Sequence, residues 1–289
     1  MDAKVDPEPR ERAVPLAGRG GAMACLEFGP QDRPVDVVFS HANGFNARTY
    51  RSILQPLAEL RILAIDLRGH GATTLPTVIE GREGWTEFRD DLLAFLEAAT
   101  EGPVVLAGHS MGGTSSLLAA AVAPQRVRAL ALFDPVVFEA ASQPIQPMES
   151  PLVQGALRRR ADFPSRGAAL EAYRGRGAFR TWTEEQLADY VDAGFQEAAE
   201  GVTLACRPEW EASNFRTHNY DPFRAFRESR APIRILRAEQ GSTAGVDAHL
   251  DELLATGRIT VETVPGTTHF LPMERPELVR AALREAVAL

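Results

Sequence analysis

The chain has 289 residues, 45% of them hydrophobic and 24% charged, which is the composition of an ordinary globular protein with one sizeable core. Its formal net charge of -8 argues against a nucleic-acid partner, because such proteins neutralise phosphates with a basic surface, and favours a small-molecule partner. Two cysteines are too few for a disulfide framework and fit a reducing compartment, so we expect a cytoplasmic protein.

The start of the chain predicts neither a signal peptide nor a membrane anchor. Residues 1–15 contain charges and prolines where a signal peptide needs an unbroken apolar stretch, and no later apolar run is long enough to span a bilayer. We therefore expect residues 1–15 to be a flexible N-terminus and the protein to have no membrane partner.

Short apolar runs alternate with longer helical patterns through the first half of the chain. The predicted strands are residues 35–40, 61–66, 103–108 and 127–134. The predicted helices between them are residues 49–60, 85–99 and 112–123. This alternation is typical of parallel strands joined by crossover helices.

The pattern changes after residue 137. Between residues 138 and 230 the chain is interrupted by Pro and Gly and is rich in aromatic residues, and short amphipathic stretches such as residues 183–199 predict helices without a convincing strand. We interpret residues 138–230 as an all-helical insertion.

Strand character returns in the last part of the chain. Residues 233–237 and 259–264 predict strands, and residues 276–289 predict a helix that begins at a proline, a favourable first-turn residue. The second block thus completes the sheet that the first began. We predict one α/β core, residues 16–137 and 231–289, with the insertion as a cap.

The strongest local motif is residues 108–112, Gly-His-Ser-Met-Gly, placed between a predicted strand and a predicted helix. Such a turn holds the serine in a strained backbone conformation, and its glycines let the strand and the helix approach closely. A serine hydroxyl is a poor nucleophile without a general base, which must itself be oriented by a third group. The motif therefore predicts Ser110 as a catalytic nucleophile.

The predicted base is His269. It follows the last predicted strand, in a loop at the carboxyl end of the sheet, where the active sites of open α/β folds collect. Three other histidines are candidates for contact with the substrate: His41, His109 and His218.

Two carboxylates compete for the third position. Asp134 ends the predicted strand 127–134 and could reach an imidazole above Ser110, whereas Glu239 lies in the loop after the predicted strand 233–237. One anion suffices to fix the histidine tautomer and stabilise the imidazolium. We favour Asp134 and keep Glu239 as the alternative.

An acyl-transfer serine also needs donors for the developing oxyanion, usually two backbone N–H groups. The turn around the serine supplies the N–H of Met111. The second donor is expected in residues 40–45, where Gly44 lets the backbone turn inward and Phe45 presents its amide; the alternative is the N–H of Asn43.

These motifs together resemble the α/β-hydrolase superfamily across most of the chain outside the cap. The matching segments are residues 40–45, similar to the oxyanion loop, residues 66–71, similar to the D-x-R-G-H-G turn, residues 108–113, similar to the nucleophile elbow, and residues 266–277, similar to the histidine loop and helix. The resemblance implies a Ser-His-acid triad and a mainly parallel eight-stranded sheet flanked by helices, with a helical cap after strand 6. It implies no cofactor, and we predict no metal site.

The resemblance departs from the family at the acid after the seventh strand, where this chain has no aspartate. Family members that lack it there can place it after the sixth strand, which supports Asp134 by analogy. A serine at the elbow excludes the aspartate-nucleophile branches, the haloalkane dehalogenases and epoxide hydrolases.

The leading function is hydrolysis of a small carboxylic ester, or of a related acyl or carbon–carbon bond, through an acyl-serine intermediate. Aromatic residues in the cap suggest an apolar acyl or alcohol group, although a small cap also needs aromatic residues for its own core. The alternative is a ligand-binding or signalling protein that keeps the fold with little or no turnover. The sequence does not fix the substrate or the oligomeric state.

Overall fold

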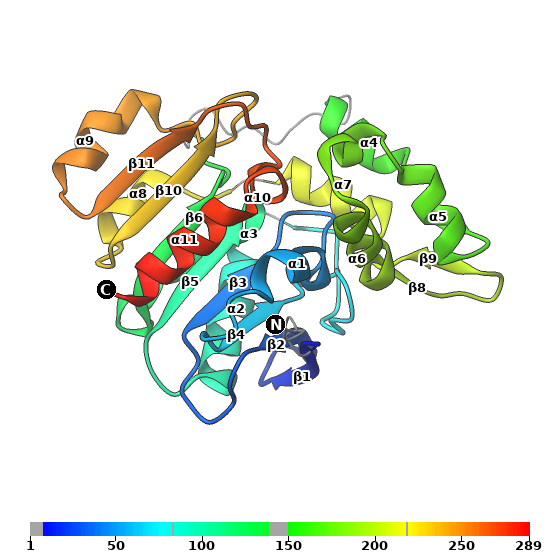
Figure 1. The fold of residues 1–289 in the computed structure, drawn as a ribbon, viewed down its shortest axis with the longest axis horizontal. Coiled ribbons are helices and arrows are strands. Elements are labelled where there is room, and N and C mark those ends of the chain that lie inside the picture. Colours follow the sequence, from blue (N-terminus) through cyan, green and yellow to red (C-terminus); the bar gives the residue numbers. More distant parts are fainter. Residues whose placement is uncertain (1–7, 83, 139–149, 218) are drawn as a thin grey trace, which may run out of the picture.

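The computed structural model of the protein describes residues 8–82, 84–138, 150–217 and 219–289. Within these residues the core is one eight-stranded sheet in the order β1-β2-β4-β3-β5-β6-β10-β11 (Figure 1). The strands are β1 (Arg10–Leu16), β2 (Gly21–Phe28), β3 (Val37–Ser40), β4 (Ile62–Ile65), β5 (Val104–His109), β6 (Val127–Phe133), β10 (Ile233–Ala238) and β11 (Ile259–Val264). β1 and β2 pair antiparallel with their neighbours and the other strands run parallel, which confirms the predicted sheet.

Helices cover both faces of this sheet. The core helices are α1 (Arg51–Leu54), α2 (Thr86–Ala99), α3 (Met111–Val122), α8 (Pro222–Glu228), α9 (Leu250–Ala255), α10 (Leu271–Glu274) and α11 (Pro276–Val287), with short 3-10 turns η1 (Ala47–Tyr50), η2 (Pro124–Arg126) and η5 (Asp247–His249). Side chains alternate along β3: Val38 packs under α2, α3 and α8, whereas Val37 and Phe39 pack under α1 and α11. The central strands β3, β4 and β5 are buried throughout, as parallel strands between two helical layers must be.

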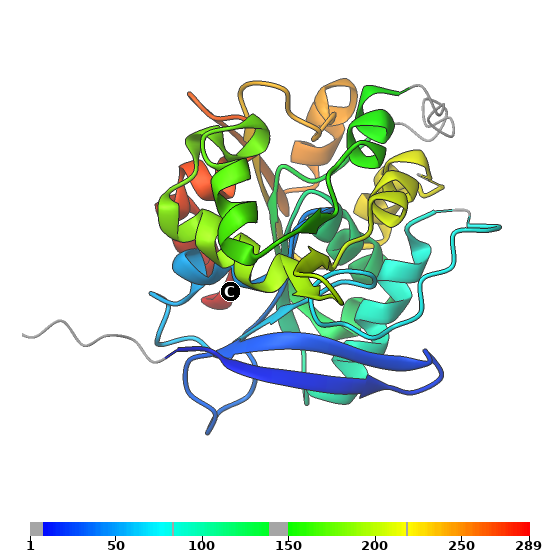
Figure 2. The same cartoon turned by 90° about the vertical axis from the view of Figure 1, so that its right-hand side faces the viewer.

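The N-terminal hairpin of β1 and β2 corrects one expectation. Residues 10–15 belong to β1 and pair with β2, so the flexible N-terminus predicted for residues 1–15 is wrong for them, while residues 1–7 lie outside the described part. The turn between the strands contains Gly18 and Gly20, both at positive φ, a conformation that glycine adopts without strain. Figure 2 shows this hairpin along the lower edge of the molecule.

The cap also differs from the prediction. Its helices are α4 (Pro151–Leu157), α5 (Arg166–Tyr173), α6 (Glu184–Gly194) and α7 (Pro208–Arg216), with the 3-10 turn η4 (Gly177–Thr181). A small antiparallel sheet joins them, formed by β7 (Asp162–Phe163), β8 (Phe195–Glu197) and β9 (Val202–Leu204) in the order β7-β9-β8. The prediction of an all-helical cap is therefore wrong. The sequence did not reveal these strands because segments of two or three residues are too short to show an alternating pattern.

Two boundaries also move. The predicted cap, residues 138–230, includes α8, yet α8 packs against α3 of the core, and residues 139–149 lie outside the described part. The helix predicted for residues 49–60 is confined to η1 and α1, since Pro56 lacks the N–H that a helix would need there. Nowhere in the described ranges is a helix both long and apolar enough to cross a bilayer.

Candidate active site

Ser110 lies at the sharp turn between β5 and α3, where the carboxyl ends of the central strands meet. It has φ 54° and ψ -121°, and Ser110 and Asp134 are the two non-glycine residues at positive φ in the described ranges. A Cβ at Gly112 would lie 2.2 Å from the carbonyl oxygen of Ser40, and one at Gly108 would lie 2.5 Å from the carbonyl carbon of Gly112. Only glycines let α3 begin this close to β3 and β5, which is how the sequence presents the serine.

A continuous line of contacts runs from Ser110 to Asp134. Ser110 Oγ lies 3.0 Å from His269 Nε2, and His269 Nδ1 lies 2.6 Å from Asp134 Oδ2. Ser110 is 6% exposed and Asp134 is fully buried, whereas a quarter of the His269 side chain is exposed. The structure thus brings together the serine, the histidine and the favoured acid from the loops after β5, β11 and β6.

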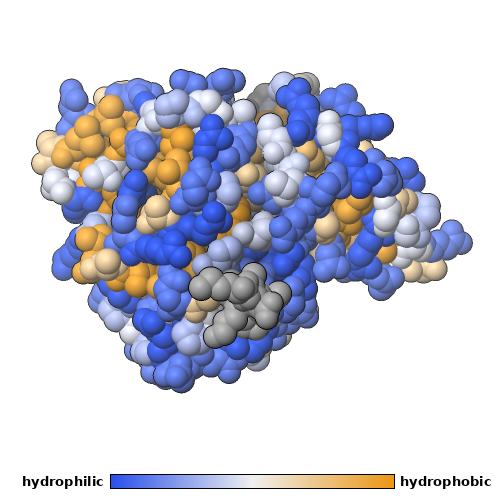
Figure 3. Space-filling view, in the orientation of Figure 1, coloured by the Kyte–Doolittle hydropathy of each residue, from blue (hydrophilic) through white to orange (hydrophobic). Residues whose placement is uncertain are grey.

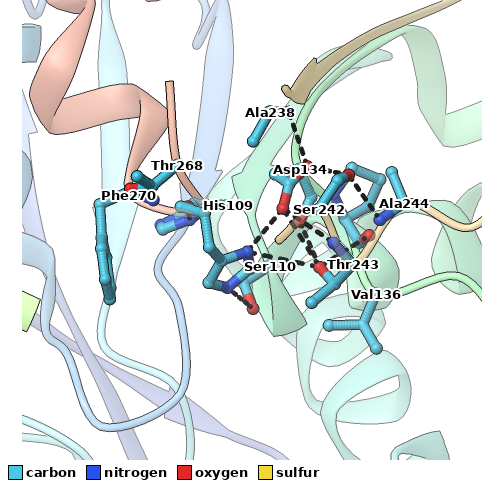
Figure 4. A network of polar contacts seen from close by, with 12 residues as sticks. His109, Ser110, Asp134, Val136, Ala238, Ser242, Thr243, Ala244, Thr268 and Phe270 are labelled. Atoms are coloured by element: carbon cyan, nitrogen blue, oxygen red, sulfur yellow. Dashed lines mark hydrogen bonds and ion pairs between the residues drawn. The ribbon is translucent and has the colours of Figure 1, made fainter. Parts of the chain in front are cut away.

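The Asp134 carboxylate is held by the loop after β10. Oδ1 accepts hydrogen bonds from Ala238 N at 2.9 Å and Ser242 Oγ at 2.5 Å, and Oδ2 accepts one from Thr243 N at 3.0 Å (Figure 4). Burial raises the pKa of this carboxyl, but the hydrogen bonds from His269, Ser242 and Ala238 outweigh it, and the pKa is lowered overall. An ionised carboxylate therefore faces the imidazole.

Sequence reasoning did not identify Ser242 and Thr243. They follow Glu239 in the loop where the family acid is absent, and here they supply donors to an acid on the neighbouring strand. Glu239 itself lies elsewhere, accepting a hydrogen bond from Gly266 N at 2.9 Å. The two adjacent hydroxyl side chains, Ser242 and Thr243, were the feature of the sequence that could have indicated donors to a carboxylate.

The loop after β3 contains both candidates for the second oxyanion donor, Phe45 and Asn43. The N–H of Phe45 donates to the carbonyl of Ala42 at 3.1 Å, so the first choice is already engaged within the loop. The N–H of Gly44 donates to His70 Nε2 at 3.0 Å. Among the described residues, none accepts a hydrogen bond from the N–H of Asn43, the alternative donor. Met111, the first residue of α3, has an N–H without a partner inside its helix.

Cap helices hold this loop through two asparagine side chains. Asn43 Nδ2 donates to the carbonyl of Glu211 at 3.1 Å, and Asn43 Oδ1 accepts from Asn214 Nδ2 at 2.7 Å, both on α7. Asn46 Nδ2 donates to the carbonyl of Tyr190 on α6 at 3.1 Å. The segment that carries the candidate donor is therefore fixed by the cap as well as by the core.

Two of the three histidines predicted to contact the substrate, His41 and His109, are buried within the fold. His41 is fully buried, with Nε2 accepting from Leu67 N at 2.9 Å and Nδ1 at 2.7 Å from the carbonyl of Ala42. His109 is also fully buried, with both ring nitrogens in hydrogen bonds. The ring nitrogens of both histidines are thus engaged inside the fold, and contact of either with the substrate stays a prediction. His218 lies outside the described residues.

Aromatic rings gather beside His269. The ring of Phe45 lies 5.1 Å from that of Trp182 in a T-shaped contact and 6.2 Å from that of Phe270, and the ring of Phe270 lies 5.8 Å from that of His269. Trp182 comes from the cap, whereas the other rings come from the core. The surroundings of the reactive groups are therefore apolar on this side.

Two cavities lie away from these groups. One, of about 720 Å³, opens between the β1–β2 hairpin and the cap and is lined by Cys25 and Asp66 among others. Another, of about 640 Å³, lies at the β10–β11 edge beside α11, where Figure 3 shows apolar side chains on the surface. Neither cavity is lined by Ser110, His269 or Asp134, so neither is the place where bond cleavage would occur. In the described part of the chain, no group of three or more His, Cys, Asp or Glu side chains is arranged to hold a metal ion.

The sequence profile of the alpha/beta hydrolase family matches residues 37–282, which is most of the chain. The chain belongs to this family. The match confirms the superfamily that the motifs indicated.

The relatives agree with this assignment. The 2-(acetamidomethylene)succinate hydrolase of Mesorhizobium japonicum is 24% identical over 252 residues, 86% of each chain. A crystal structure of E-2-(acetamidomethylene)succinate hydrolase superposes with a TM-score of 0.78 at 23% identity, covering 97% of this chain and 100% of the other. A hypothetical protein of Pseudomonas aeruginosa PAO1 superposes with a TM-score of 0.73 at 26% identity, covering 99% of each chain. Such likenesses establish the fold.

Proposed function

We propose that the protein is a serine hydrolase that cleaves a small carboxylic ester, or a related acyl or carbon–carbon bond, through an acyl-serine intermediate. The observation that supports this most directly is the contact line Ser110 Oγ to His269 Nε2 at 3.0 Å and His269 Nδ1 to Asp134 Oδ2 at 2.6 Å. The membership of a hydrolase family agrees with it.

In the proposed first step His269 Nε2 takes the proton of Ser110 as its Oγ bonds to the acyl carbon of the substrate. The imidazolium that forms is stabilised by Asp134, whose lowered pKa keeps it ionised at neutral pH. His269 then protonates the leaving group, whose bond to the acyl carbon breaks. In the second half, His269 takes a proton from water as the water oxygen bonds to the acyl carbon. The bond from that carbon to Ser110 Oγ then breaks, and His269 returns the proton to Oγ.

Two backbone donors fit the negative charge that develops on the acyl oxygen. We assign these roles to the N–H of Met111 and the N–H of Asn43, since the N–H of Phe45 is engaged with Ala42. A pair of preorganised N–H groups is the usual oxyanion hole of acyl transfer.

The substrate proposal follows from the surroundings of His269. The rings of Phe45, Trp182 and Phe270 favour an apolar group on one side of the scissile bond. The named substrate of the Mesorhizobium japonicum relative contains an acetamide, so amides belong in a substrate screen beside esters and thioesters. The proposal keeps the small-molecule partner and the cytoplasmic location that the sequence predicts.

Intact-protein mass spectrometry after treatment with a small fluorophosphonate tests the proposal. We expect one adduct that peptide mapping places on Ser110 and that the Ser110→Ala variant lacks. Folded protein that forms no adduct, or an adduct that persists in Ser110→Ala, would contradict the mechanism. The first of these results would favour a ligand-binding protein with little turnover.

A further inference from the structure

His109 precedes Ser110 and yet faces the opposite way, into the molecule. It is fully buried, and its two ring nitrogens make contacts with two different parts of the site. Nδ1 lies 2.7 Å from the hydroxyl of Tyr50, and Nε2 lies 2.7 Å from the backbone carbonyl of His269. The hydroxyl of Tyr50 in turn lies 3.2 Å from the backbone N–H of Ala42.

The end groups and a neutral ring together fix the direction of every hydrogen bond in this chain. The N–H of Ala42 can only donate, so the Tyr50 oxygen accepts there. A neutral His109 that carries its proton on Nε2 has a bare Nδ1, which accepts from the Tyr50 hydroxyl. The carbonyl of His269 can only accept, so His109 Nε2 must carry a proton. The chain is satisfied by one form of His109, the neutral imidazole protonated at Nε2.

The surroundings support the neutral form. Burial, and to a smaller extent the nearby His269, lower the pKa of His109 to about 3, so a charged ring is disfavoured. Tyr50 is fully buried and burial raises the pKa of its phenol well above the ordinary value, which keeps its proton available to donate.

The two ends of the chain lie at the two places where the proposed reaction needs fixed geometry. The chain ends at the N–H of Ala42, one residue before the N–H of Asn43. His269 carries the base, and its carbonyl is the atom that His109 holds. Catalytic groups must stay within about 0.5 Å of their productive positions, and neighbours that lock them are part of the site.

We infer that His109 is a positioning residue: with Tyr50, it ties the backbone of the base His269 to the loop that presents the Asn43 N–H, across Ser110. This inference rests on the proposed function, because it assigns His109 a role through His269 and Asn43. It also gives a reason for a histidine in the middle of the elbow, where both its ring nitrogens are engaged inside the fold.

A purely structural role makes a different prediction. A buried polar side chain with satisfied hydrogen bonds stabilises the fold, and its loss would lower stability without affecting turnover by the folded enzyme. The positioning role predicts that kcat falls while KM is nearly unchanged, and that a side chain able to restore the hydrogen bond to His269 restores kcat.

The first measurement is the tautomer of His109 in full-length protein labelled with ¹⁵N-histidine, by NMR at neutral pH. His109→Gln identifies its resonances by their loss. We expect a neutral ring with its proton on Nε2. A proton on Nδ1, or on both nitrogens, would overturn the inference, since in neither form can Nδ1 accept from the Tyr50 hydroxyl.

The second measurement is steady-state kinetics on an ester found by the screen. His109→Leu removes both hydrogen bonds at similar volume, and we expect a 10- to 100-fold loss in kcat with KM within about twofold. His109→Gln keeps an N–H that can reach the His269 carbonyl, and should recover kcat to within about fivefold of wild type. Equal losses in these two variants, or kcat within twofold of wild type in His109→Leu, would overturn the inference.

Tyr50→Phe and Ser116→Ala complete the set. Tyr50→Phe deletes one hydroxyl, breaks the chain at its centre and should lower kcat about threefold to tenfold; it remains informative if His109→Leu does not fold. Ser116 is also fully buried, and its hydroxyl bonds within α3 to the carbonyl of Gly112, so Ser116→Ala is the matched control with near wild-type kcat. A kcat loss in the control equal to that in Tyr50→Phe would show a general effect of buried polar groups and overturn the inference.

Failure of the inference can be told apart from failure of the proposed function. If Ser110→Ala keeps its turnover, the proposed function is wrong, and with it the role of His109, whatever the tautomer. If Ser110→Ala is inactive while His109→Leu is unimpaired, the function stands and the positioning role is wrong.

Discussion

The two sides of Ser110 are built in different ways. On the base side, His269 and Asp134 are held by groups of the core, because Ser242 and Thr243 come from the loop after β10. On the oxyanion side, the loop of residues 41–46 is held by cap helices, through Asn43 to α7 and Asn46 to α6. The Asp134 carboxylate is therefore held by the core, whereas the oxyanion loop also depends on how the cap sits on the core. The helix that follows His269 meets the cap through the hydrogen bond from Gln186 to the carbonyl of Met273.

Two buried carboxylates, Asp134 on the base side and Asp66 on the oxyanion side, have pKa values that move in opposite directions. Asp134 has a lowered pKa because the hydrogen bonds it accepts outweigh its burial. Asp66 accepts hydrogen bonds from the N–H of Ala47, next to the oxyanion loop, and from that of Ala72, but burial raises its pKa to about 6. Asp134 accepts hydrogen bonds from the His269 and Ser242 side chains as well as from the backbone, whereas Asp66 accepts them only from the backbone N–H groups of Ala47 and Ala72.

Asp134→Asn should have the largest effect, since it breaks the base side without changing the volume of the side chain. The isosteric amide removes the anion that orients His269 and stabilises its imidazolium, and we expect kcat/KM to fall by about 10⁴-fold. The measurement is steady-state hydrolysis at neutral pH, with circular dichroism to establish that the variant is folded.

Glu239→Gln is the matched control for that variant. Glu239 accepts from Gly266 N and does not reach His269, so its replacement should change kcat/KM by no more than about threefold. A large loss in this variant with a small one in Asp134→Asn would return the acid to the loop after β10.

The base side could be predicted from the sequence more fully than the oxyanion side. The elbow and Asp134 follow the apolar, buried strands β5 and β6, and the histidine loop follows the edge strand β11, whose two ends are buried. The carboxyl ends of parallel strands meet at one edge of the sheet, so the sequence could predict that these residues lie together. The sequence favours the N–H of Phe45 as the donor in the loop after β3. It gives no sign that this N–H is already engaged by the carbonyl of Ala42, because the conformation of the turn leaves no pattern in the sequence.

The remaining misses have a common physical cause. The sequence of β1 is charged and contains a proline, and Val14 and Leu16 are its only buried residues. The strand forms because its backbone pairs with β2. The cap strands have two or three residues each and exist through their pairing with one another. Structure that depends on pairing between distant segments leaves little local periodicity, whereas the central strands are marked by their own apolar residues.

Asp66→Asn sharpens the comparison of the two carboxylates through pH. Because the pKa of Asp66 rises from 3.8 to about 6 on folding, its stabilising contribution is complete below pH 4 and is lost as the pH rises through 6. The unfolding free energy of wild type relative to Asp66→Asn should fall by about 3 kcal/mol between pH 4 and pH 7. Urea unfolding at several pH values measures this difference.

Asp134→Asn provides the opposite sign in the same experiment. A lowered pKa gives a contribution that is present above about pH 4, the unfolded value, and is lost as the pH falls below it. The difference between wild type and Asp134→Asn should therefore stay level from pH 5 to pH 7. Parallel curves for the two variants would refute the contrast between the two carboxylates.

Asn214→Asp tests whether the cap holds the oxyanion side. The new carboxylate keeps its pairing with Arg82 but places an oxygen against Asn43 Oδ1, so the hydrogen bond becomes a repulsion. Removing an oxyanion donor costs about 10²- to 10³-fold in kcat, and displacing one should cost about 10- to 100-fold. Ser213→Ala, on the same helix but without contact to Asn43, should leave kcat nearly unchanged; equal losses in both would assign the effect to α7 packing.

Thr183→Ala should have the smallest effect and tests whether the cap can open by itself. Thr183 and Gln186 form a capping box at the start of α6, and Gln186 Nε2 donates to the carbonyl of Met273 on α10, just beyond His269. Loss of the cap should destabilise α6 by about 1 kcal/mol, so its amides should exchange with solvent about fivefold faster, while β5 amides are unaffected. Faster exchange in α6 alone would make the cap a separately opening unit and the oxyanion side the part of the site exposed to its motion. Equal acceleration in α6 and β5 would mean that cap and core open together, and the two sides of Ser110 would then differ in their contacts but not in their dynamics.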